Sequence, residues 1–505
     1  MTKPVATLFL FFLALQCIVF FTPLQAQQRV KPVIAGDFAD PSIIRVGSTY
    51  YAAGTSSEWA PHFPVYISTD LKNWKHQGYI FNKAPEWTAG SFWAPEYYKI
   101  GNTYYLYYTA RRKKDSVSYI GVATSAYPDK GFVDHGVIVN FGKEAIDAFV
   151  YNDMGQLYIT FKAYGLDNRP IELLGSKLSK DGLKLEGSPF FLMKDEPRMG
   201  MEGQSILKKG NFYYLFYSAG NCCGAACSYN VRVARSKKFT GPYENFTGNP
   251  VLQGGGDFTC TGHGTFVNTA DGKYYYLHHA YSNKNGVFTG RQGMLAELVW
   301  PNNSGWPAFK ETETAPAAPA AINDLFNNKL AAKYWQWDFR NAMPVVQQRN
   351  GSLFLSGTAR ADNLTGIVLT VKPVSDSFDI TTTVVNHNNV LKGLAFYGDA
   401  NAAVGVGTIG GKVVFWEVRS NKRNILAEAD IGSTLPVQLK LTMKPDATTL
   451  VYYRQGKEQW KLLPTAQPVS VQFLPQWDRS PRAGLHFKGG PTEQAQFSEF
   501  SFKSY

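Results

Sequence analysis

A repeated pattern is the feature of this 505-residue sequence that most constrains its fold. Five times a glycine is followed by a segment rich in aromatic residues, and successive glycines are 54, 54, 55 and 62 residues apart. A period of this size predicts a β-propeller in which each repeat forms one blade. The five segments begin at Gly47, Gly101, Gly155, Gly210 and Gly272.

The residues seven to nine positions before each glycine predict a functional site. If each repeat places this position on the innermost strand of its blade, all five side chains point towards one axis. Three of these residues are carboxylates, one is a histidine and one is a tryptophan. Such a cluster is typical of an active site. The five residues are Asp40, Trp93, Asp147, Glu202 and His263.

Composition and spacing predict an all-β chain of two domains. Aromatic residues make up 15% of the sequence and there are 46 glycines, which favours strands and tight turns. We expect a five-bladed β-propeller over residues 30–310. Residues 311–321 read ETETAPAAPAA, which is typical of a semi-rigid linker. The alternating strands of residues 322–505 carry no such repeat and predict a β-sandwich of jelly-roll type.

Residues 1–26 read as a signal peptide. Lys3 precedes an apolar run, and Leu24-Gln25-Ala26 is a plausible cleavage site. A retained anchor helix is the alternative. No later stretch approaches the ~20 apolar residues that span a bilayer, so we expect no membrane span in the mature chain. The chain is expected to be exported, either to the periplasm or by secretion.

The net charge of +12 is scattered along the sequence. We interpret it as a solvated basic surface, with an acidic polysaccharide or an anionic cell surface as the alternative partner. Nucleic acid is not an expected partner, because no basic stripe lies on a recognisable module. Nothing in the pattern specifies an oligomeric state.

Four cysteines remain after the signal segment: Cys222, Cys223, Cys227 and Cys260. In an exported protein they predict disulfides, and four cysteines allow three pairings. We expect a local disulfide that stiffens the loop after the fourth aromatic segment. A zinc site is the alternative, although the Cys-Cys-x3-Cys spacing is not usual for zinc ligands.

The three carboxylates lie in sequence contexts that suit acid–base chemistry. Pro41 biases Asp40 towards an extended conformation, which aims its carboxylate, although Asp-Pro is also a common turn pair. Asp147 and Glu202 lie in apolar or glycine-rich segments with no basic residue beside them. Burial of this kind raises the pKa of a carboxyl group and suits one of the two to act as a general acid. The alternative is an acid that only bonds to the backbone.

The other two members of the cluster have less defined duties. His263 lies between two glycines, and it either binds a central cation through water, orients a carboxylate, or is a satisfied core histidine. Trp93 facing a carboxylate cluster suggests a platform for the apolar face of a sugar ring. A plain core aromatic is the alternative.

Several motifs in residues 35–310 resemble family 43 glycoside hydrolases and occur in that family's order. The first is Asp40-Pro-Ser-Ile-Ile-Arg-Val-Gly-Ser-Thr-Tyr-Tyr, which resembles the family's first blade. Members of the family are five-bladed propellers that hydrolyse glycosidic bonds with inversion. The other motifs are Ser68-Thr-Asp-Leu-Lys-Asn-Trp74, Trp93-Ala-Pro-Glu96, Ile146-Asp147, Glu202-Gly203, Gly290-Arg291, Trp300 and Gly305-Trp306-Pro307.

The resemblance implies separate roles for the site residues. Asp40 would be the general base, Glu202 the general acid, and Asp147 the residue that orients the acid and tunes its pKa. Arg291 matches a position that often contacts substrate, and His263 one near a central calcium ion or water cluster. No further cofactor is expected. We also expect Phe38 and Phe149 to bind substrate. Gln204 departs from the family, where many relatives have proline.

Two signals disagree on the substrate. Asp324-Leu-Phe-Asn and Trp335-Gln-Trp337 resemble the start of the concanavalin-like sandwich of xylosidase and arabinofuranosidase members, in which a sandwich loop narrows the pocket and favours attack on a terminal sugar. Cys222-Cys223-Gly instead resembles the arabinan-cleaving branch.

We therefore expect an inverting glycosidase that removes terminal α-L-arabinofuranosyl or β-D-xylosyl residues from oligo- or polysaccharides. In such an enzyme the two working carboxyl groups stand roughly 6.5–9.5 Å apart. An endo-arabinanase, a galactofuranosidase and a non-catalytic sugar-binding propeller are the alternatives. A sialidase-type propeller is less well supported. The segment from Ser68-Thr-Asp70 to Trp74 faintly resembles the repeated motif of that class but is one residue shorter than it.

Overall fold

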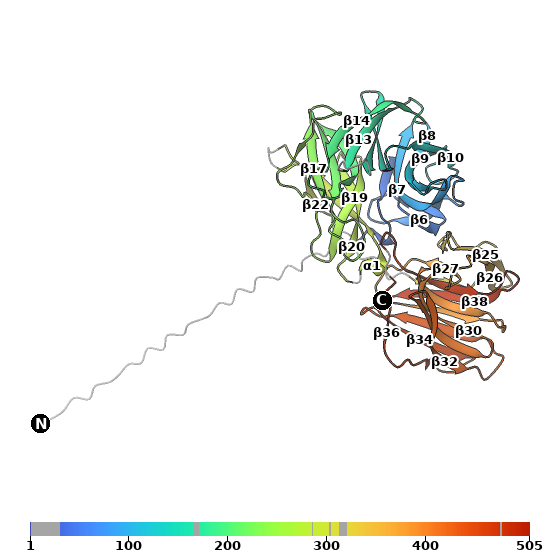
Figure 1. Cartoon of the computed structure of the whole chain (residues 1–505). Helices are drawn as coiled ribbons and strands as arrows, with labels where there is room; N and C mark the ends of the chain where they lie inside the picture. The colour runs from blue at the N-terminus through green and yellow to red at the C-terminus, as the bar shows by residue number, and fades with distance from the viewer. Residues whose placement is uncertain (2–30, 165–170, 285, 302–304, 313–320, 475–476) are drawn as a thin grey trace.

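The N-terminal part of the chain is a β-propeller of five blades (Figure 1). The computed structural model describes residue 1 and residues 31–164, 171–284, 286–301, 305–312, 321–474 and 477–505. The predicted signal peptide and most of the predicted linker lie outside these described residues. The propeller confirms the fold class that the repeat predicted.

Each of the first four blades is an antiparallel sheet of four strands. Blade 1 is β2 (Ser42–Val46), β3 (Thr49–Ala53), β5 (His62–Ser68) and β6 (Lys75–Phe81). Blade 2 is β7 (Thr88–Ile100), β8 (Thr103–Arg112), β9 (Ser118–Ser125) and β10 (Val133–Val139). Blade 3 is β11 (Glu144–Asp153), β12 (Gln156–Tyr164), β13 (Glu172–Leu178) and β14 (Leu185–Lys194). Blade 4 is β15 (Glu202–Lys209), β16 (Phe212–Ala219), β17 (Asn230–Ser236) and β18 (Glu244–Asn245).

Blade 5 closes the ring with strands from both ends of the domain. Its strands are β19 (Phe258–Asn268), β20 (Tyr274–Ser282), β21 (Gln292–Val299), β22 (Ala308–Glu311) and, from the N-terminus, β1 (Ile34–Asp37). Because β1 pairs with β21, the start of the domain is hydrogen-bonded to its last blade. The inner strands β2, β7, β11, β15 and β19 each contact the next around the axis.

The repeated glycine makes the turn between the first and second strand of each blade. All five glycines have positive φ, from 57° at Gly210 to 95° at Gly155. This left-handed conformation is strained for most side chains and is accessible to glycine. The aromatic segment after it is the second strand, so the residues before it lie on or beside the innermost strand, as predicted.

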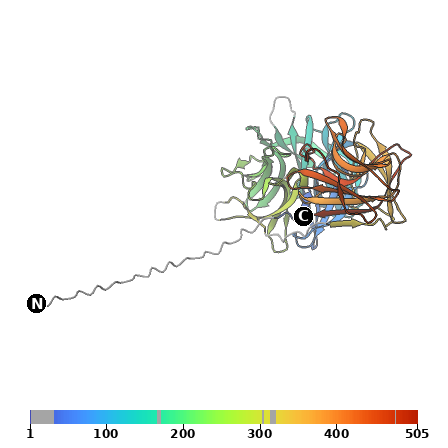
Figure 2. The same cartoon turned by 90° about the horizontal axis from the view of Figure 1, so that it is seen from below.

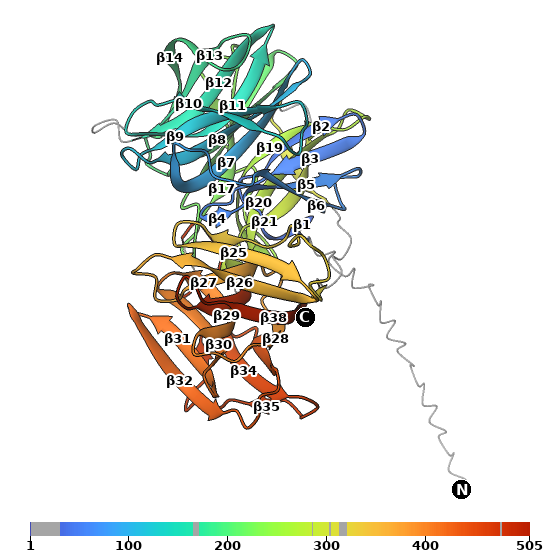
Figure 3. The same ribbon diagram turned by 90° about the vertical axis from the view of Figure 1, so that its right-hand side faces the viewer.

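The C-terminal part consists mainly of two sheets packed face to face (Figure 3). One sheet contains β23 (Ala321–Asp324), β25 (Ala342–Arg349), β26 (Ser352–Ala359), β28 (Phe378–Val384), β33 (Val437–Met443), β34 (Thr448–Gln455), β35 (Lys461–Leu462), β36 (Val469–Ser470) and β38 (Ala495–Ser504). The other contains β27 (Ile367–Val371), β29 (Leu391–Asp399), β30 (Ala402–Ile409), β31 (Lys412–Arg419), β32 (Lys422–Asp430) and β37 (Arg482–Lys488). Both sheets contribute to one apolar core, which includes Phe378 and Phe396. This is the sandwich architecture that the alternating strands predicted.

The sandwich packs directly against the propeller (Figure 3), and in the view from below it overlaps part of the propeller (Figure 2). A short antiparallel pair joins β4 (Trp59–Ala60) of the propeller to β24 (Trp337–Asp338). Trp59 is fully buried among sandwich residues, and its ring meets Tyr397 edge to face. The helix α1 (Gly286–Thr289) places Phe288 in the sandwich core. Within the described residues, no helix has the length and hydropathy to span a bilayer.

Candidate active site

Each blade has a residue with left-handed backbone geometry on its inner strand or, in blade 1, two residues before it. The φ angles are 48° at Asp40, 42° at Ala94, 59° at Asp147, 58° at Gly203 and 37° at His263. In blades 2 to 5 the strand register is irregular at this point, as in a β-bulge. Non-glycine residues in this conformation are uncommon and cluster at functional sites. The repeated position is thus a structural device that re-aims side chains.

The position of the left-handed residue in each blade differs slightly from the position predicted by counting back from the repeated glycine. Asp40, Asp147 and His263 occupy the left-handed position itself, whereas Trp93 and Glu202 lie one residue before Ala94 and Gly203. All five nevertheless lie on or beside inner strands. The structure brings Asp40, Asp147, Glu202 and His263 into one linked cluster.

Asp40 is held by hydrogen-bond partners from the first and fifth blades. Arg291 Nη1 lies 3.1 and 3.3 Å from its two carboxylate oxygens, and Thr55 Oγ1 donates to Oδ2 at 2.7 Å. The backbone N–H of Asp40 donates to Nδ1 of His279 at 3.0 Å. Burial alone would raise the pKa of Asp40, but Arg291 and the two histidines nearby hold this pKa well below its usual range. Asp40 is therefore an ionised carboxylate.

Asp147 lies between Asp40 and Glu202. Its Oδ2 accepts a hydrogen bond from the N–H of Gly203 at 3.1 Å. The Nδ1 atom of His263 is 3.8 Å from this oxygen and 3.4 Å from Oδ1 of Asp40, so the histidine bridges the two carboxylates. Burial raises the pKa of Asp147 to about 6, and the neighbouring charge of Glu202 adds to the effect while His263 opposes it.

Glu202 has a hydrogen-bond donor on each carboxylate oxygen. Lys162 Nζ lies 2.5 Å from Oε2, and the hydroxyl of Tyr229 donates to Oε1 at 2.8 Å. Burial would raise the pKa of Glu202, but the Lys162 ammonium group lowers it overall. No basic residue lies immediately beside Glu202 in the sequence. The raised pKa that was expected of one of the two carboxyl groups belongs to Asp147, whereas the pKa of Glu202 is lowered in the free protein. Folding supplies the cation from β12 of the adjacent blade.

Lys162 was missed because nothing near Glu202 in the sequence points to it. The one sequence feature that could have indicated Lys162 is its position in β12, where it is a charged residue among apolar ones such as Phe161 and Ala163.

Gln204, which departs from the family pattern, also has a structural role. Its side-chain amide donates to the backbone carbonyl of Asp147 at 2.5 Å and to Thr160 Oγ1 at 3.2 Å.

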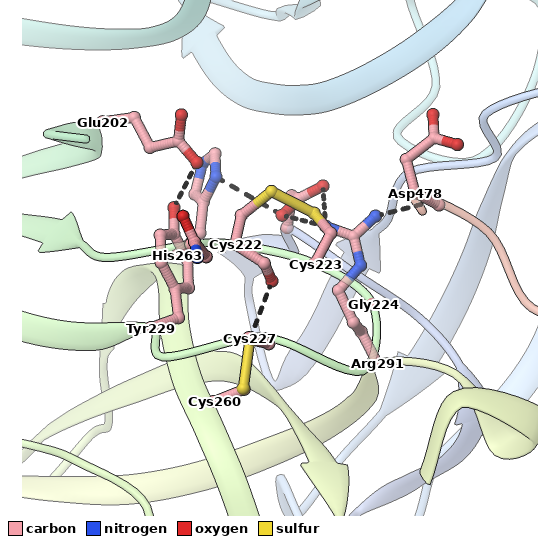
Figure 4. Close-up of a disulfide and its surroundings, with 12 residues drawn as sticks. Glu202, Cys222, Cys223, Gly224, Cys227, Tyr229, Cys260, His263, Arg291 and Asp478 are labelled. Carbon is pink, nitrogen blue, oxygen red and sulfur yellow. Dashed lines mark hydrogen bonds and ion pairs between the residues drawn. A yellow bond between two sulfur atoms is a disulfide. The ribbon is translucent and has the colours of Figure 1, made fainter. Parts of the chain in front are cut away.

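The sandwich contributes Asp478 to this site. Its Oδ2 accepts a hydrogen bond from the indole N–H of Trp93 at 2.9 Å. Its backbone carbonyl accepts a hydrogen bond from Arg291 Nη2 at 3.1 Å (Figure 4). The same carbonyl accepts from Ser57 Oγ at 2.9 Å. The accessory domain therefore fixes two of the predicted substrate-binding residues, Trp93 and Arg291.

The four cysteines form two disulfides, Cys222–Cys223 and Cys227–Cys260. Three of them lie in the loop between β16 and β17, which is the loop that was expected to be stiffened. The zinc alternative is wrong, because every candidate thiolate is bonded to another sulfur. The first pair joins adjacent residues, and the second ties the loop to β19, the strand of His263.

The expectation that Phe38 binds substrate is wrong. Its side chain is fully buried and packs against Tyr66 at a ring-centroid distance of 5.0 Å, so it supports the site from the core and offers no surface to a substrate. Phe149 is partly buried against the core between blades 3 and 4, and its contact with substrate stays a prediction.

The predicted calcium ion near the axis has no direct side-chain ligand set in the described part of the chain. There, no group of three or more His, Cys, Asp or Glu side chains is arranged to hold a metal ion. His263 directs Nδ1 at two carboxylates. A water-mediated ion stays a prediction, and we assign it no step.

Fold and site together define a class of protein: five-bladed propellers with an acidic cluster on the axis and an accessory β-sandwich. The sequence profile of glycosyl hydrolases family 43 matches residues 30–307. The chain belongs to this family of glycosidases, and it is an enzyme that hydrolyses O-glycosyl bonds.

Relatives in sequence include enzymes with several named activities. An extracellular exo-α-(1→5)-L-arabinofuranosidase of Cellvibrio japonicus is 31% identical over 316 residues, which cover 55% of this chain and 87% of the relative. An extracellular endo-α-(1→5)-L-arabinanase of Bacillus subtilis is 28% identical and covers 54% and 87%. A non-reducing end α-L-arabinofuranosidase of Bacteroides ovatus is 29% identical over 363 residues, or 65% of each chain.

Solved structures match both domains. A xylan β-1,4-xylosidase of Bacillus halodurans has a TM-score of 0.81 at 20% identity, covering 94% of this chain and 100% of that one. A family 43 protein of Bacillus licheniformis has a TM-score of 0.80 at 20% identity, covering 94% and 99%. At this identity the match establishes the shared two-domain fold.

Proposed function

We propose that this enzyme is an inverting, exo-acting glycosidase that releases terminal α-L-arabinofuranosyl or β-D-xylosyl residues from plant-type oligo- and polysaccharides. One observation carries the proposal: three carboxylates meet at the axis in three different electrostatic environments. Asp40 is ionised beside Arg291, Glu202 is paired with Lys162, and Asp147 lies between them with a raised pKa. Groups whose environments separate their pKa values in this way suit acid and base roles.

Asp40 is the proposed general base. An ionised carboxylate accepts a proton from the water molecule that attacks the anomeric carbon. Arg291 and Thr55 hold both carboxylate oxygens in fixed directions, so little orientation is lost when the water binds.

Glu202 is the proposed general acid, and Lys162 controls when it can act. A glycosidic oxygen that approaches Oε2 competes with the Lys162 ammonium group for this atom. Displacing the ammonium group removes the charge that lowers the pKa of Glu202, and the buried carboxyl group then favours its protonated form. Proton donation to the leaving oxygen follows from this state.

Asp147 and His263 are the proposed tuning pair. The negative charge of Asp147 raises the pKa of Glu202 once Lys162 has moved, while His263 keeps Asp147 and Asp40 in a fixed arrangement. Trp93, held by Asp478, is the proposed platform for the terminal sugar ring. Arg291 is the proposed contact for a sugar hydroxyl as well as the partner of Asp40.

Exo action is supported by the approach of the sandwich to the site. Asp478 reaches both Trp93 and Arg291, so this side of the axis is bordered by protein. The names of the Cellvibrio and Bacteroides relatives agree with release of terminal arabinofuranose. An endo-arabinanase is the second candidate, because the relative of Bacillus subtilis carries that name and the arabinan-type Cys-Cys-Gly segment is present.

Two measurements test the proposal. A panel of nitrophenyl α-L-arabinofuranoside, β-D-xyloside and β-D-galactofuranoside, followed by arabinan and arabinoxylan oligosaccharides, identifies the sugar and shows whether single residues are released. NMR of the first-formed anomer tests inversion. Asp40→Asn and Glu202→Gln should each lose about 10²–10⁴-fold in kcat with the fold intact. Near-normal turnover in either variant would contradict the assigned roles.

We also propose that the protein acts outside the cytoplasm. Two of the relatives are named as extracellular enzymes, and both disulfides suit an oxidising compartment. Fractionation of cells that express the full chain, with N-terminal sequencing of the product, distinguishes periplasmic from secreted protein and tests cleavage after Ala26.

A further inference from the structure

Two apolar groups border the carboxylate cluster and have no part in the chemistry proposed above. One is the disulfide between the adjacent residues Cys222 and Cys223. The other is Trp477, a sandwich residue whose side chain is 62% exposed. We propose that these two groups form the surface that binds the leaving-group sugar, the second pentose of an oligosaccharide substrate. This inference rests on the proposed function.

The disulfide is supported by two tyrosines that also belong to the site. Cys222 packs against a buried cluster that includes Tyr229 and Tyr281. The hydroxyl of Tyr229 donates a hydrogen bond to Glu202. Tyr281 is close enough to Arg291 and Asp40 for their charges to affect its pKa. In the view of Figure 4 the disulfide is drawn between Glu202 and Arg291, and Tyr229 connects it to Glu202.

Because the disulfide loop lies on the Glu202 side of the site, it is the leaving-group sugar that this surface would contact. The general acid donates its proton to the glycosidic oxygen, so the sugar beyond that oxygen lies on the Glu202 side of the bond. The loop from 220 to 229 belongs to the same blade as Glu202, and its last residue is the tyrosine that holds Glu202. A group on this loop is therefore placed to contact the leaving sugar.

The loop is rigid before any ligand arrives. The second disulfide joins Cys227 to Cys260 on β19. The backbone N–H of Ser228 donates to the carbonyl of Asn221 at 3.0 Å, and that of Gly224 donates to the hydroxyl of Tyr281 at 3.3 Å. A surface fixed in this way loses little conformational entropy when it binds a ligand.

Trp477 lies directly beside the disulfide loop. A Cβ atom built on Gly224 would be 3.9 Å from the Cα atom and 4.0 Å from Cδ1 of Trp477, which is ordinary contact. The next residue, Asp478, is fixed by Trp93, Arg291 and Ser57. Trp477 is thus an exposed indole anchored at the point where the sandwich meets the catalytic cluster.

The chemistry of this surface suits a sugar ring. Cys223 is buried and Cys222 is half-buried, so Cys222 carries most of the exposed area of the disulfide. Its sulfur atom is polarizable and has no hydrogen-bond donor, and the indole of Trp477 presents a flat apolar face. The C–H face of a pentose is apolar, whereas its hydroxyl groups point outward and remain hydrated. A xylosyl or arabinosyl ring can therefore rest on this surface without leaving buried polar groups unpaired.

The test separates binding of the second sugar from binding of the first. In a Glu202→Gln background, Trp477→Ala and the double change Cys222→Ala with Cys223→Ala are compared by calorimetry for arabinose, xylose, arabinobiose and xylobiose. We expect the affinity for the disaccharide to fall about tenfold in each variant while that for the monosaccharide stays within about twofold. Tyr127→Ala, an exposed aromatic at the β9–β10 turn of blade 2, is the matched control.

The outcomes distinguish this inference from the proposed function. Mass spectrometry first checks that Cys227–Cys260 stays closed in the double variant, and thermal melting checks the fold of each protein. Equal losses for monosaccharide and disaccharide, or no loss at all, would overturn the sugar-binding surface alone if the wild-type enzyme hydrolyses the disaccharide. A wild-type enzyme that neither hydrolyses nor binds any of these sugars would overturn the proposed function and this surface with it.

Discussion

Lys162 of the third blade donates a hydrogen bond to Glu202 of the fourth blade, so a buried ammonium group faces the proposed general acid. The two groups come from neighbouring blades, and both side chains are nearly buried. The charge state of the site therefore depends on how blades 3 and 4 pack against each other. It also makes the protonation of Glu202 sensitive to one distant residue.

Lys162→Met should shift the basic limb of the pH profile of kcat/KM to higher pH by about one unit or more, because loss of the ammonium charge raises the pKa of Glu202. The profile of kcat should shift much less, since kcat reports the complex in which substrate has already displaced Lys162. Lys177→Met, an exposed change on β13 of the same blade, is the control. An unchanged basic limb in kcat/KM would contradict the role of Lys162.

Arg291→Met should move the acidic limb of kcat/KM to higher pH. Arg291 is the main charge that lowers the pKa of Asp40, and without it the base becomes protonated at a higher pH. Arg291→Lys keeps the charge but changes the geometry, so its limb should lie between those of the wild type and Arg291→Met. The prediction fails if the two variants have the same acidic limb as the wild type.

Glu96→Gln should make stability less dependent on pH. Glu96 is buried on β7, where Ser42 Oγ of β2 donates to its carboxyl group at 2.6 Å, and burial raises its pKa to about 8. A carboxyl group with a raised folded-state pKa contributes full stability below its unfolded pKa and loses it as pH rises through about 8.

The wild-type protein should therefore lose on the order of a few kcal/mol relative to Glu96→Gln between pH 5 and pH 8.5. Urea unfolding of both proteins at the two pH values measures this difference, and groups common to both cancel. Glu86→Gln, an exposed change, should follow the wild type. A constant difference between wild type and Glu96→Gln at both pH values would exclude Glu96 as the source.

Asp478→Ala should lower kcat/KM about tenfold while leaving the propeller folded, because the indole N–H of Trp93 loses its acceptor. The backbone carbonyl that holds Arg291 and Ser57 remains, so the loop should keep its place. Asp362→Ala, an exposed change elsewhere in the sandwich, should leave kcat/KM unchanged. Equal activities of the two variants would mean that the sandwich does not act through Trp93.

Much of the propeller could be predicted because its signals are local. A glycine with positive φ and the aromatic strand after it recur in every blade, and each signal lies within a few residues. The candidate residues Asp40, Asp147, Glu202 and His263 followed from the same local register. Counting reached the correct position only to within one residue at Trp93 and Glu202, because bulges insert residues that a period does not reveal.

Contacts between distant segments could not be predicted in the same way. Phe38 lies near Asp40 in sequence and was expected to bind substrate, but its side chain packs against Tyr66 in the core. The pairing of four cysteines depends on which loops meet, and three arrangements were equally compatible with the sequence.

The sequence by itself determined the number of blades, the second β domain and which carboxylates share an axis, because these follow from a period and from residue types. Only the tertiary structure decided how those carboxylates are charged. The groups that surround the cluster come from three separate parts of the fold. Lys162 lies on β12 of blade 3, Arg291 directly precedes β21 of blade 5, and Asp478 belongs to the sandwich. A pKa depends on the distance to such charges in space, and this distance is set only when the blades close and the sandwich docks.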